Sequence, residues 1–310
     1  MRVVFAGTPG FSVPCLTALI ETEGIDVVGV VSQPDRPAGR GMKLTPSPVK
    51  QAAIDAGIDV ITPEKLRQND EALAWLEAKQ CDVLVVVAFG MILPKSWLET
   101  PTLAPVNVHA SLLPRWRGAA PIERSLLAGD AQTGVCIMQM EEGLDTGGIY
   151  ATAVLPITAS TTGSELWFQL SPLGAALLLQ TLPQIEAGLQ PVPQPEAGVT
   201  YAKKITNDER IIEWSKPADE IDRLVRCFSP RPGVRAMCNG KWLKLIAGEV
   251  LTDLHHSEPG IVVAADQSLD IACADGSVYR ISELQPEGKK AMQAGDFLRG
   301  VQLEAGDRLS

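Results

Sequence analysis

The sequence lacks several features that define common classes of protein. It has no run of about 18 apolar residues, the length that a transmembrane helix needs. Its 6 cysteines include no Cys-x-x-Cys pair, which disfavours both a structural zinc site and a redox dithiol. The first residues, Met1 to Gly7, are typical of a β-strand ending in glycine rather than of a signal peptide. We therefore expect a cytoplasmic protein with buried free thiols, no metal and no membrane partner.

Two nucleotide-binding motifs are also missing. The segment Gly7-Thr8-Pro9-Gly10 follows the first predicted strand but lacks the glycine spacing of a dinucleotide fingerprint. The phosphate-binding pattern Gly-x-x-x-x-Gly-Lys-Ser/Thr occurs nowhere in the chain. Neither NAD nor ATP is therefore indicated as a ligand.

Acidic residues are absent from two stretches of an otherwise acidic chain. The net charge of -10 argues by itself against a nucleic-acid partner, because phosphate contacts need clustered cations. The charged residues between Arg223 and Gly248 are all basic, however: Arg223, Arg226, Arg231, Arg235, Lys241 and Lys244. Those between Arg36 and Ala53 are basic too: Arg36, Arg40, Lys43 and Lys50. Two solvated faces are one interpretation, but two such patches in an acidic chain favour an anionic partner.

The length and the segment pattern predict two domains, the first of them α/β. A chain of 310 residues with 45% hydrophobic content can bury two cores. A helix is predicted to begin after Ser47 and to stop near Gly57, which makes Gln33–Pro46 a long exposed loop. Strand-like runs alternate with helical stretches, as a doubly wound parallel sheet requires; the strands are Arg2–Ala6, Ile25–Val31, Val83–Ala88 and Val106–His109.

The second half of the chain changes character after a proline-rich stretch. Ser164–Leu189 has a helical composition, although Pro172 and Pro183 should kink or break that helix. An amphipathic stretch, Ala218–Cys227, precedes short strands that are separated by turn pairs such as Asn239-Gly240. This pattern predicts a small antiparallel barrel. We therefore expect a first domain over residues 1–189, a semi-rigid linker over 190–204 and a second domain over 205–310.

The segment Val106-Asn107-Val108-His109 places two polar side chains on one face of a strand. In a β-strand, Asn107 and His109 project from the same side, roughly 6–7 Å apart at Cα. His109 also falls at the carboxyl end of the strand, where open parallel sheets bind their ligands. One interpretation is a hydrogen-bonded pair in the core. The other is a catalytic pair.

Asp145 lies in a glycine-rich loop, Glu142 to Gly148, which follows a strand predicted over Gly134–Met140. A turn-capping aspartate is one interpretation of such a residue. Beside His109, however, its carboxylate would fix the imidazole tautomer, while the Asn107 amide could donate to an oxygen that becomes negative. Such a trio suits acyl transfer. Because no serine or cysteine has an evident activating partner, direct attack by an amine or water fits better than an acyl-enzyme.

Five strings of the sequence are specific enough for comparison with known families: Phe5-Ala6-Gly7-Thr8-Pro9, Gln33 to Gly41, Asn107 to Ile122, Gly143 to Gly147 and Leu284 to Met292. They resemble strings of the methionyl-tRNA formyltransferase family, and the resemblance covers essentially the whole chain. No departure occurs at the proposed catalytic positions, and the differences at Gly10, Phe89 and Ala110 are small.

The resemblance implies a Rossmann-like formyltransferase domain followed by a small OB-like β-barrel that binds tRNA. It implies that 10-formyltetrahydrofolate donates its formyl group to the α-amino nitrogen of methionine on initiator tRNA, and we expect a monomer. The catalytic residues would be Asn107, His109 and Asp145. The residues around the folate would be Ser111, Leu112, Leu113, Pro114, Phe89, Gly90, Met91 and Ile92. For Leu112, Leu113 and Ile92, ordinary core packing is the alternative.

The resemblance and the charge pattern both indicate a polynucleotide partner. Arg36, Arg40 and Lys43 would meet the acceptor end of the tRNA, and the six basic residues of the second domain would follow its backbone. Three other functions share part of this pattern. They are a formyltransferase for a small amine such as glycinamide ribonucleotide or an amino sugar, a formyltetrahydrofolate hydrolase, and a non-enzymatic RNA-binding module.

Overall fold

The computed structural model describes residues 1–39, 41–252 and 254–310, which form two compact units. Unit 1 comprises Met1–Ile122, Gln132–Pro156 and Trp167–Lys203, and unit 2 comprises Glu123–Ala131, Ile157–Leu166 and Lys204–Ser310. Within the described residues, no helix combines the length and the apolar character that crossing a bilayer requires. All 6 cysteines are buried and free, as predicted.

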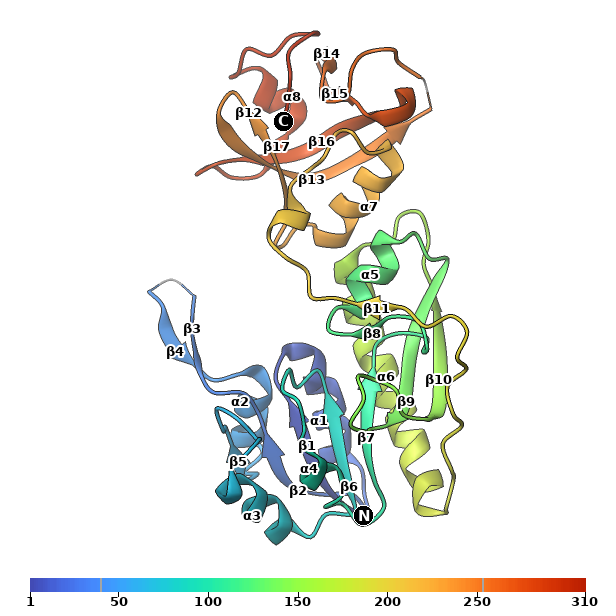
Figure 1. Ribbon diagram of the computed structural model, residues 1–310. Helices are drawn as coiled ribbons and strands as arrows, with labels where there is room; N and C mark the ends of the chain where they lie inside the picture. The colour runs from blue at the N-terminus through green and yellow to red at the C-terminus, as the bar shows by residue number, and fades with distance from the viewer. Residues whose placement is uncertain (40, 253) are drawn as a thin grey trace. The chain divides into compact units, whose positions relative to one another are not determined.

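Unit 1 is built on a seven-stranded sheet in the order β10-β9-β7-β6-β1-β2-β5 (Figure 1). Five neighbouring strands, β5, β2, β1, β6 and β7, are parallel, whereas β9 and β10 are antiparallel additions at one edge. The predicted parallel α/β sheet is therefore confirmed. Its strands are β1 (Arg2–Gly7), β2 (Asp26–Val31), β5 (Val60–Ile61), β6 (Val83–Val87), β7 (Ala104–His109), β9 (Gln132–Gln139) and β10 (Ile149–Pro156).

Helices and short turns connect these strands. Ser47 caps α2 as predicted, because its hydroxyl accepts a hydrogen bond from the Lys50 amide, and Pro48 occupies the first turn. The helices are α1 (Val13–Glu21), α2 (Pro48–Asp55), α3 (Asp70–Lys79), α4 (Lys95–Leu98), α5 (Pro121–Leu127) and α6 (Gly163–Glu186), with a 3-10 turn η1 (Gly10–Ser12).

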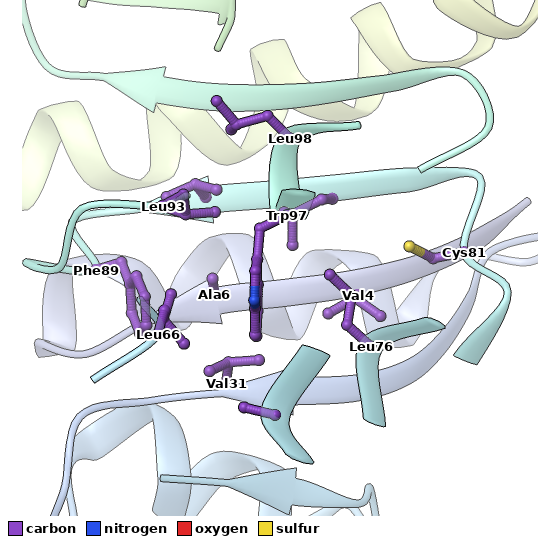
Figure 2. Close-up of a cluster of buried hydrophobic side chains, with 13 residues drawn as sticks. Val4, Ala6, Val31, Leu66, Leu76, Cys81, Phe89, Leu93, Trp97 and Leu98 are labelled. Atoms are coloured by element: carbon purple, nitrogen blue, oxygen red, sulfur yellow. The ribbon is translucent and has the colours of Figure 1, made fainter. Parts of the chain in front are cut away.

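A hydrophobic cluster fixes the parallel strands against α3 and α4. Trp97 of α4 is fully buried at the centre of this cluster, among side chains that alternate along β1 and β6 (Figure 2). All five residues of β6 are buried, as expected for a parallel strand covered on both faces. On the other face, Gly174 lets α6 approach β7 closely, since a Cβ there would lie 2.8 Å from Val108 Cγ1. This packing determines which face of β7 points away from α6.

One prediction about secondary structure was wrong. The segment Gln33–Pro46 is not a plain loop, because β3 (Arg36–Ala38) and β4 (Lys43–Thr45) pair as a hairpin. Of the kink or break expected in the second-half helix, the break does not occur, because α6 continues through both prolines. Pro172 and Pro183 lie on its exposed side, where water can satisfy the carbonyl groups that each leaves without a donor, while the opposite side is held by burial.

Unit 2 carries a six-stranded antiparallel sheet, as the second-half pattern predicted. Asn239 and Gly240 form its first hairpin turn, both with positive φ. The pairing ends at β12 and β14, and no link between them is seen in the described ranges. The strands are β12 (Val234–Cys238), β13 (Lys241–Leu251), β14 (Val262–Ala265), β15 (Leu269–Ala272), β16 (Val278–Pro286) and β17 (Met292–Gln293). The helices are η2 (Asp208–Arg210), α7 (Ala218–Phe228), η3 (Ala274–Gly276) and α8 (Ala294–Leu298).

Candidate functional site

Asn107 and His109 lie on the face of β7 that points away from α6. The intervening Val108 packs toward Gly174, so the two polar side chains share the opposite face, as the strand period predicts. His109 is 5% exposed, whereas Asn107 is half-buried. A polar pair of this kind requires partners, because an unbonded buried polar group is destabilising.

Asp145 supplies partners for both residues from the loop between β9 and β10. Its Oδ1 accepts a 3.4 Å hydrogen bond from Asn107 Nδ2. Its Oδ2 lies 3.7 Å from His109 Nδ1 and accepts a 2.7 Å hydrogen bond from the Gly118 amide. The carboxylate is therefore anchored by a main-chain N–H and lies against both β7 side chains. The three residues that the sequence singled out occupy one site.

The second ring nitrogen of His109 is also engaged. Nε2 lies 3.0 Å from the main-chain oxygen of Trp116. Because a carbonyl only accepts, this contact is a hydrogen bond when Nε2 carries the hydrogen. In that tautomer the lone pair of Nδ1 faces the Asp145 side, so a proton gained at Nδ1 would point at a carboxylate.

Positive backbone φ angles cluster around this site. Trp116, Gly118 and Asp145 have φ angles of 65°, 122° and 51°. A bulky residue such as Trp116 rarely adopts this region, at a cost of about 1–3 kcal/mol, so the surrounding contacts must impose it. At Gly118, a Cβ would lie 2.8 Å from the Ala202 oxygen, so only glycine permits that approach.

The two segments that the resemblance assigned to folate follow adjacent parallel strands. Phe89–Ile92 comes after β6 and Ser111–Pro114 comes after β7, so both lie at the carboxyl edge of the sheet. The Phe89 oxygen accepts hydrogen bonds from Thr8 Oγ1 and Gln33 Nε2, which ties the first segment to its neighbours. The structure thus brings both segments to the edge that also carries His109.

Individual side chains of these segments differ in what they offer a ligand. Phe89 is 2% exposed and belongs to the core, whereas Ile92 exposes 91% of its apolar side chain. Ser111 is buried and donates to the Arg115 oxygen, so its hydroxyl is engaged within the protein. Gly90 and Met91 are exposed and half-buried, and Leu112, Leu113 and Pro114 are buried or half-buried.

A second set of residues around the site was not found from the sequence. We call residues 190–203 the strap; it was expected to be part of a linker, yet it belongs to unit 1 and pairs β11 (Tyr201–Ala202) with β8 (Arg117–Gly118). Gln194 of the strap donates to the Asp145 and Gly147 oxygens at 2.8 and 2.7 Å. No local signal marks Gln194, because its partners are distant in sequence. The nearest signal in the sequence was its partner Arg117, which lies within the Asn107 to Ile122 string.

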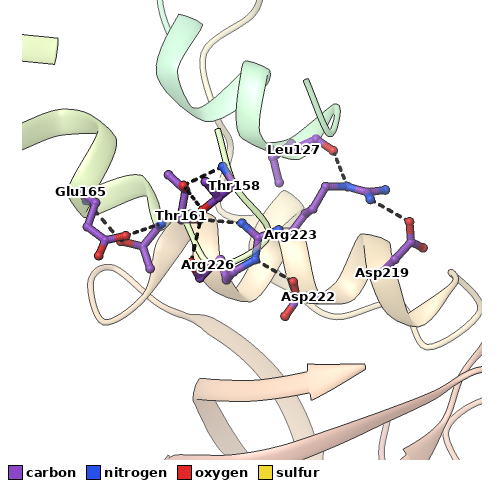
Figure 3. A network of polar contacts seen from close by, with 10 residues as sticks. Leu127, Thr158, Thr161, Glu165, Asp219, Asp222, Arg223 and Arg226 are labelled. Carbon is purple, nitrogen blue, oxygen red and sulfur yellow. Dashed lines mark hydrogen bonds and ion pairs between the residues drawn. The ribbon is translucent and has the colours of Figure 1, made fainter. Parts of the chain in front are cut away.

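Two of the six basic residues of unit 2 form ion pairs. Arg223 binds Asp219 at 2.7 Å and the Leu127 oxygen at 3.3 Å (Figure 3). Arg226 binds Asp222 at 2.6 Å and donates to the Thr161 oxygen. These guanidinium groups hold α7 to neighbouring segments of unit 2. Their charge is therefore largely neutralised within the unit.

The remaining four basic residues behave differently. Within residues 1–39, 41–252 and 254–310, Arg231, Arg235, Lys241 and Lys244 form no ion pair. Arg235 and Lys244 are paired across β12 and β13, and Arg235 lies 5.2 Å from the centre of the Trp242 ring. Desolvation, with the nearby charges of Arg231 and Arg210, lowers the pKa of Lys244. Among the residues that the structure describes, this concentration of positive charge has no ion-pair partner.

The basic residues of the first predicted patch are in the β3–β4 hairpin. Arg36 and Lys43 are exposed, and Arg36 donates to Gln33 Oε1. Arg40 lies outside the described residues. Lys50 is different, because it forms a 2.7 Å ion pair with Asp35.

Comparison with known proteins gives close matches along the chain. Residues 1–182 match the family model "Formyl transferase", and residues 204–302 match "Formyl transferase, C-terminal domain". A methionyl-tRNA formyltransferase of Magnetococcus marinus is 50% identical over 99% of this chain and 98% of the relative. One of Neisseria gonorrhoeae is 46% identical over 100% of both chains.

Solved structures share the fold at lower identity. A methionyl-tRNA formyltransferase from Clostridium thermocellum matches with a TM-score of 0.59 and 15% identity, covering 80% of this chain and 93% of that one. A sugar 3N-formyl transferase, solved in the presence of dTDP and 5-N-formyl-THF, matches with a TM-score of 0.68 and 18% identity, covering 94% and 99% of the two chains.

Proposed function

The chain belongs to the methionyl-tRNA formyltransferase family, and we propose on that premise that it transfers the formyl group of 10-formyltetrahydrofolate to the α-amino group of methionyl initiator tRNA. The main support for the proposed site is that Asp145 contacts both other residues. Its Oδ1 lies 3.4 Å from Asn107 Nδ2, and its Oδ2 lies 3.7 Å from His109 Nδ1. We also propose that the reaction takes place in the cytoplasm, with its tRNA substrate, and that the enzyme acts as a monomer.

Asn107 is proposed to stabilise the charge that develops on the formyl oxygen. As the amine attacks the formyl carbon, that oxygen becomes negative and requires a fixed donor. The Asn107 amide has two hydrogens, and its bond to Asp145 Oδ1 leaves one of them for the substrate. One such donor is typically worth about 3–4 kcal/mol of transition-state stabilisation.

His109 is proposed to take the proton that the attacking amine loses, directly or through water. With Nε2–H donated to the Trp116 oxygen, Nδ1 is the nitrogen that can receive it. The resulting imidazolium would face Asp145 Oδ2, 3.7 Å from Nδ1, which stabilises its charge. Proton transfer of this kind contributes typically about 10²–10⁴-fold to the rate.

The folate is proposed to bind along the segments that follow β6 and β7. An apolar side chain that is 91% exposed, Ile92, favours an apolar ligand surface at this edge of the sheet. Gly90, Met91 and Ile92 would line one side of the folate, and Ser111–Pro114 the other. Phe89 would support its segment from the core.

The tRNA is proposed to contact the basic residues that form no ion pair within the described part of the chain. In unit 2 these are Arg231, Arg235, Lys241 and Lys244, whose charges are available to neutralise phosphates. In the β3–β4 hairpin they are Arg36 and Lys43, with Arg40 proposed from the sequence alone. Arg223 and Arg226 are weaker candidates, because acids and carbonyls already engage them.

The first experiment is formyl transfer from 10-formyltetrahydrofolate to methionyl initiator tRNA. Parallel reactions contain uncharged tRNA, free methionine, glycinamide ribonucleotide or no acceptor. We expect formylation of the charged tRNA only. Transfer confined to a small amine would replace the partner and keep the site, formate release without acceptor would indicate a hydrolase, and tRNA binding without turnover would indicate a binding module.

A further inference from the structure

We infer that Gln194 of the strap is a positioning residue that holds the Asp145 loop in its reactive geometry. Its side-chain amide donates two hydrogen bonds, at 2.8 and 2.7 Å, to the oxygens of Asp145 and Gly147. These two carbonyls lie on either side of Thr146, so one amide group clips the loop at the residue that contacts Asn107 and His109. The inference rests on the proposed catalytic role of Asp145.

The amide of Gln194 is itself oriented by Arg117. The Arg117 guanidinium donates to Gln194 Oε1 from Nε at 3.0 Å and from Nη2 at 2.7 Å. This contact fixes which end of the amide faces the loop, since the oxygen is occupied and the nitrogen must point at the carbonyls. Arg117 adjoins Gly118, whose amide donates to Asp145 Oδ2. A closed circuit therefore runs from Asp145 through Gly118, Arg117 and Gln194 back to Asp145.

The backbone of the strap keeps Gln194 in place on both sides. Before it, the main chains of Val192 and Ile149 exchange hydrogen bonds of 2.8 and 2.9 Å. After it, Thr200 accepts from the Trp116 amide through Oγ1 and from the Arg117 amide through its oxygen, both at 2.9 Å. The strap thus spans the two segments that supply partners to His109 and Asp145.

The glycines of the Asp145 loop fit this close approach. At Gly148, a Cβ would lie 2.9 Å from Pro191 Cβ and 3.1 Å from the Val192 oxygen. At Gly147, a Cβ would lie 1.9 Å from the Gln139 oxygen. Asp145 has a φ of 51°, a conformation that surrounding contacts must hold in place. Gln194 provides two of these contacts.

The test compares Gln194→Leu with Gln190→Leu in the full-length enzyme. Gln190 is the matched control, because it is an exposed glutamine of the same strap whose side chain donates to the nearby Gly188 oxygen and not to the Asp145 loop. Gln194→Leu should lower kcat for formyl transfer about 10–100-fold, as expected for a displaced catalytic group. The KM values for folate and tRNA should stay within about twofold, and Gln190→Leu should match the wild type in all three.

Two further variants separate positioning from folding. Gln194→Glu keeps the acceptor for Arg117 but removes both donors to the loop, so kcat should fall as in Gln194→Leu. Arg117→Leu removes the hydrogen bonds that orient the Gln194 amide. The double variant Arg117→Leu/Gln194→Leu should be no slower than the slower single variant, because both residues act on Asp145 through the same set of contacts. A full kcat in Gln194→Glu, or additive losses in the double variant, would overturn the inference.

A measurement that needs no substrate keeps the inference distinct from the proposed function. Amide hydrogen exchange over residues 116–118 and 141–149 should accelerate about tenfold in Gln194→Leu and stay unchanged in Gln190→Leu. Unchanged exchange in both variants would refute the positioning role even if the wild type formylates tRNA. If the wild type transfers no formyl group, the proposed function fails instead, whatever the exchange data show.

Discussion

The polar residues of the two proposed functional regions are held in opposite ways. Around β7 in unit 1, Asn107, His109 and Asp145 are joined to each other or to main-chain groups. In unit 2, Arg235 and Lys244 belong to a basic group that forms no ion pair within the described residues. The contrast follows from what each region must do. A reacting centre needs fixed geometry, whereas a phosphate-binding surface needs charge that is not already neutralised.

Removing an interconnected residue should produce the largest effect. His109→Ala should lower formyl transfer about 10²–10⁴-fold, because both the proton acceptor and the partner of Asp145 are lost. Single-turnover kinetics, with circular dichroism to verify folding, would measure it. His256→Ala is the matched control, since that histidine is exposed and no role is assigned to it. Near-normal turnover in His109→Ala would show that the interconnected residues around β7 are not the reacting centre.

Substitution of Arg226 should reduce stability rather than tRNA use. Arg226 and Asp222 each expose 17% of the side chain, so Arg226→Met should lower the free energy of unfolding by about 1–3 kcal/mol. Arg223→Met should cost less, under about 1 kcal/mol, because its partner Asp219 is 59% exposed. Urea denaturation would compare the two. An Arg226 variant of full stability with weakened tRNA binding would instead move this residue into the tRNA-binding group.

Substitution of Lys244 should act on tRNA binding and on its salt dependence. Lys244→Ala should raise the KM for charged tRNA and lower the slope of log K against log salt by about 1, as expected for one lost phosphate contact. The KM for folate should not change. Titration from low to moderate salt, with Arg223→Ala as the reference, would measure the slope. An identical slope in wild type and Lys244→Ala would remove Lys244 from the interface.

The smallest effect is expected for the ion pair between Glu209 and Arg124. The hydrogen bonds from Arg124 lower the pKa of Glu209 from 4.5 to about 2. Because the folded-state pKa is the lower one, the pair stabilises unit 2 above pH 4.5, and this contribution is lost as the pH falls toward about 2. Glu209→Gln should therefore lower the urea midpoint slightly at pH 7 and progressively less in acid. A constant difference across pH would contradict the assignment.

Local signals in the sequence predicted elements whose determinants are close along the chain. Ser47 caps α2, and Asn239-Gly240 turns the first hairpin of unit 2, because each depends on a few neighbouring residues. The amphipathic stretch over Ala218–Cys227 became α7 for the same reason. Pro172 and Pro183 did not end α6, although local preference favours a break at proline. Burial of one helix face outweighed the lost hydrogen bonds of Pro172 and Pro183.

The sequence by itself determined that Asn107 and His109 share one face of a strand, since side chains in a strand alternate with period two. It also identified Asp145, through its glycine-rich loop and the family resemblance. Only the tertiary structure decided how the carboxylate is held. Gly118, Arg117 and Gln194 act on it from segments up to 77 residues apart, and such contacts follow from chain packing rather than from any local pattern.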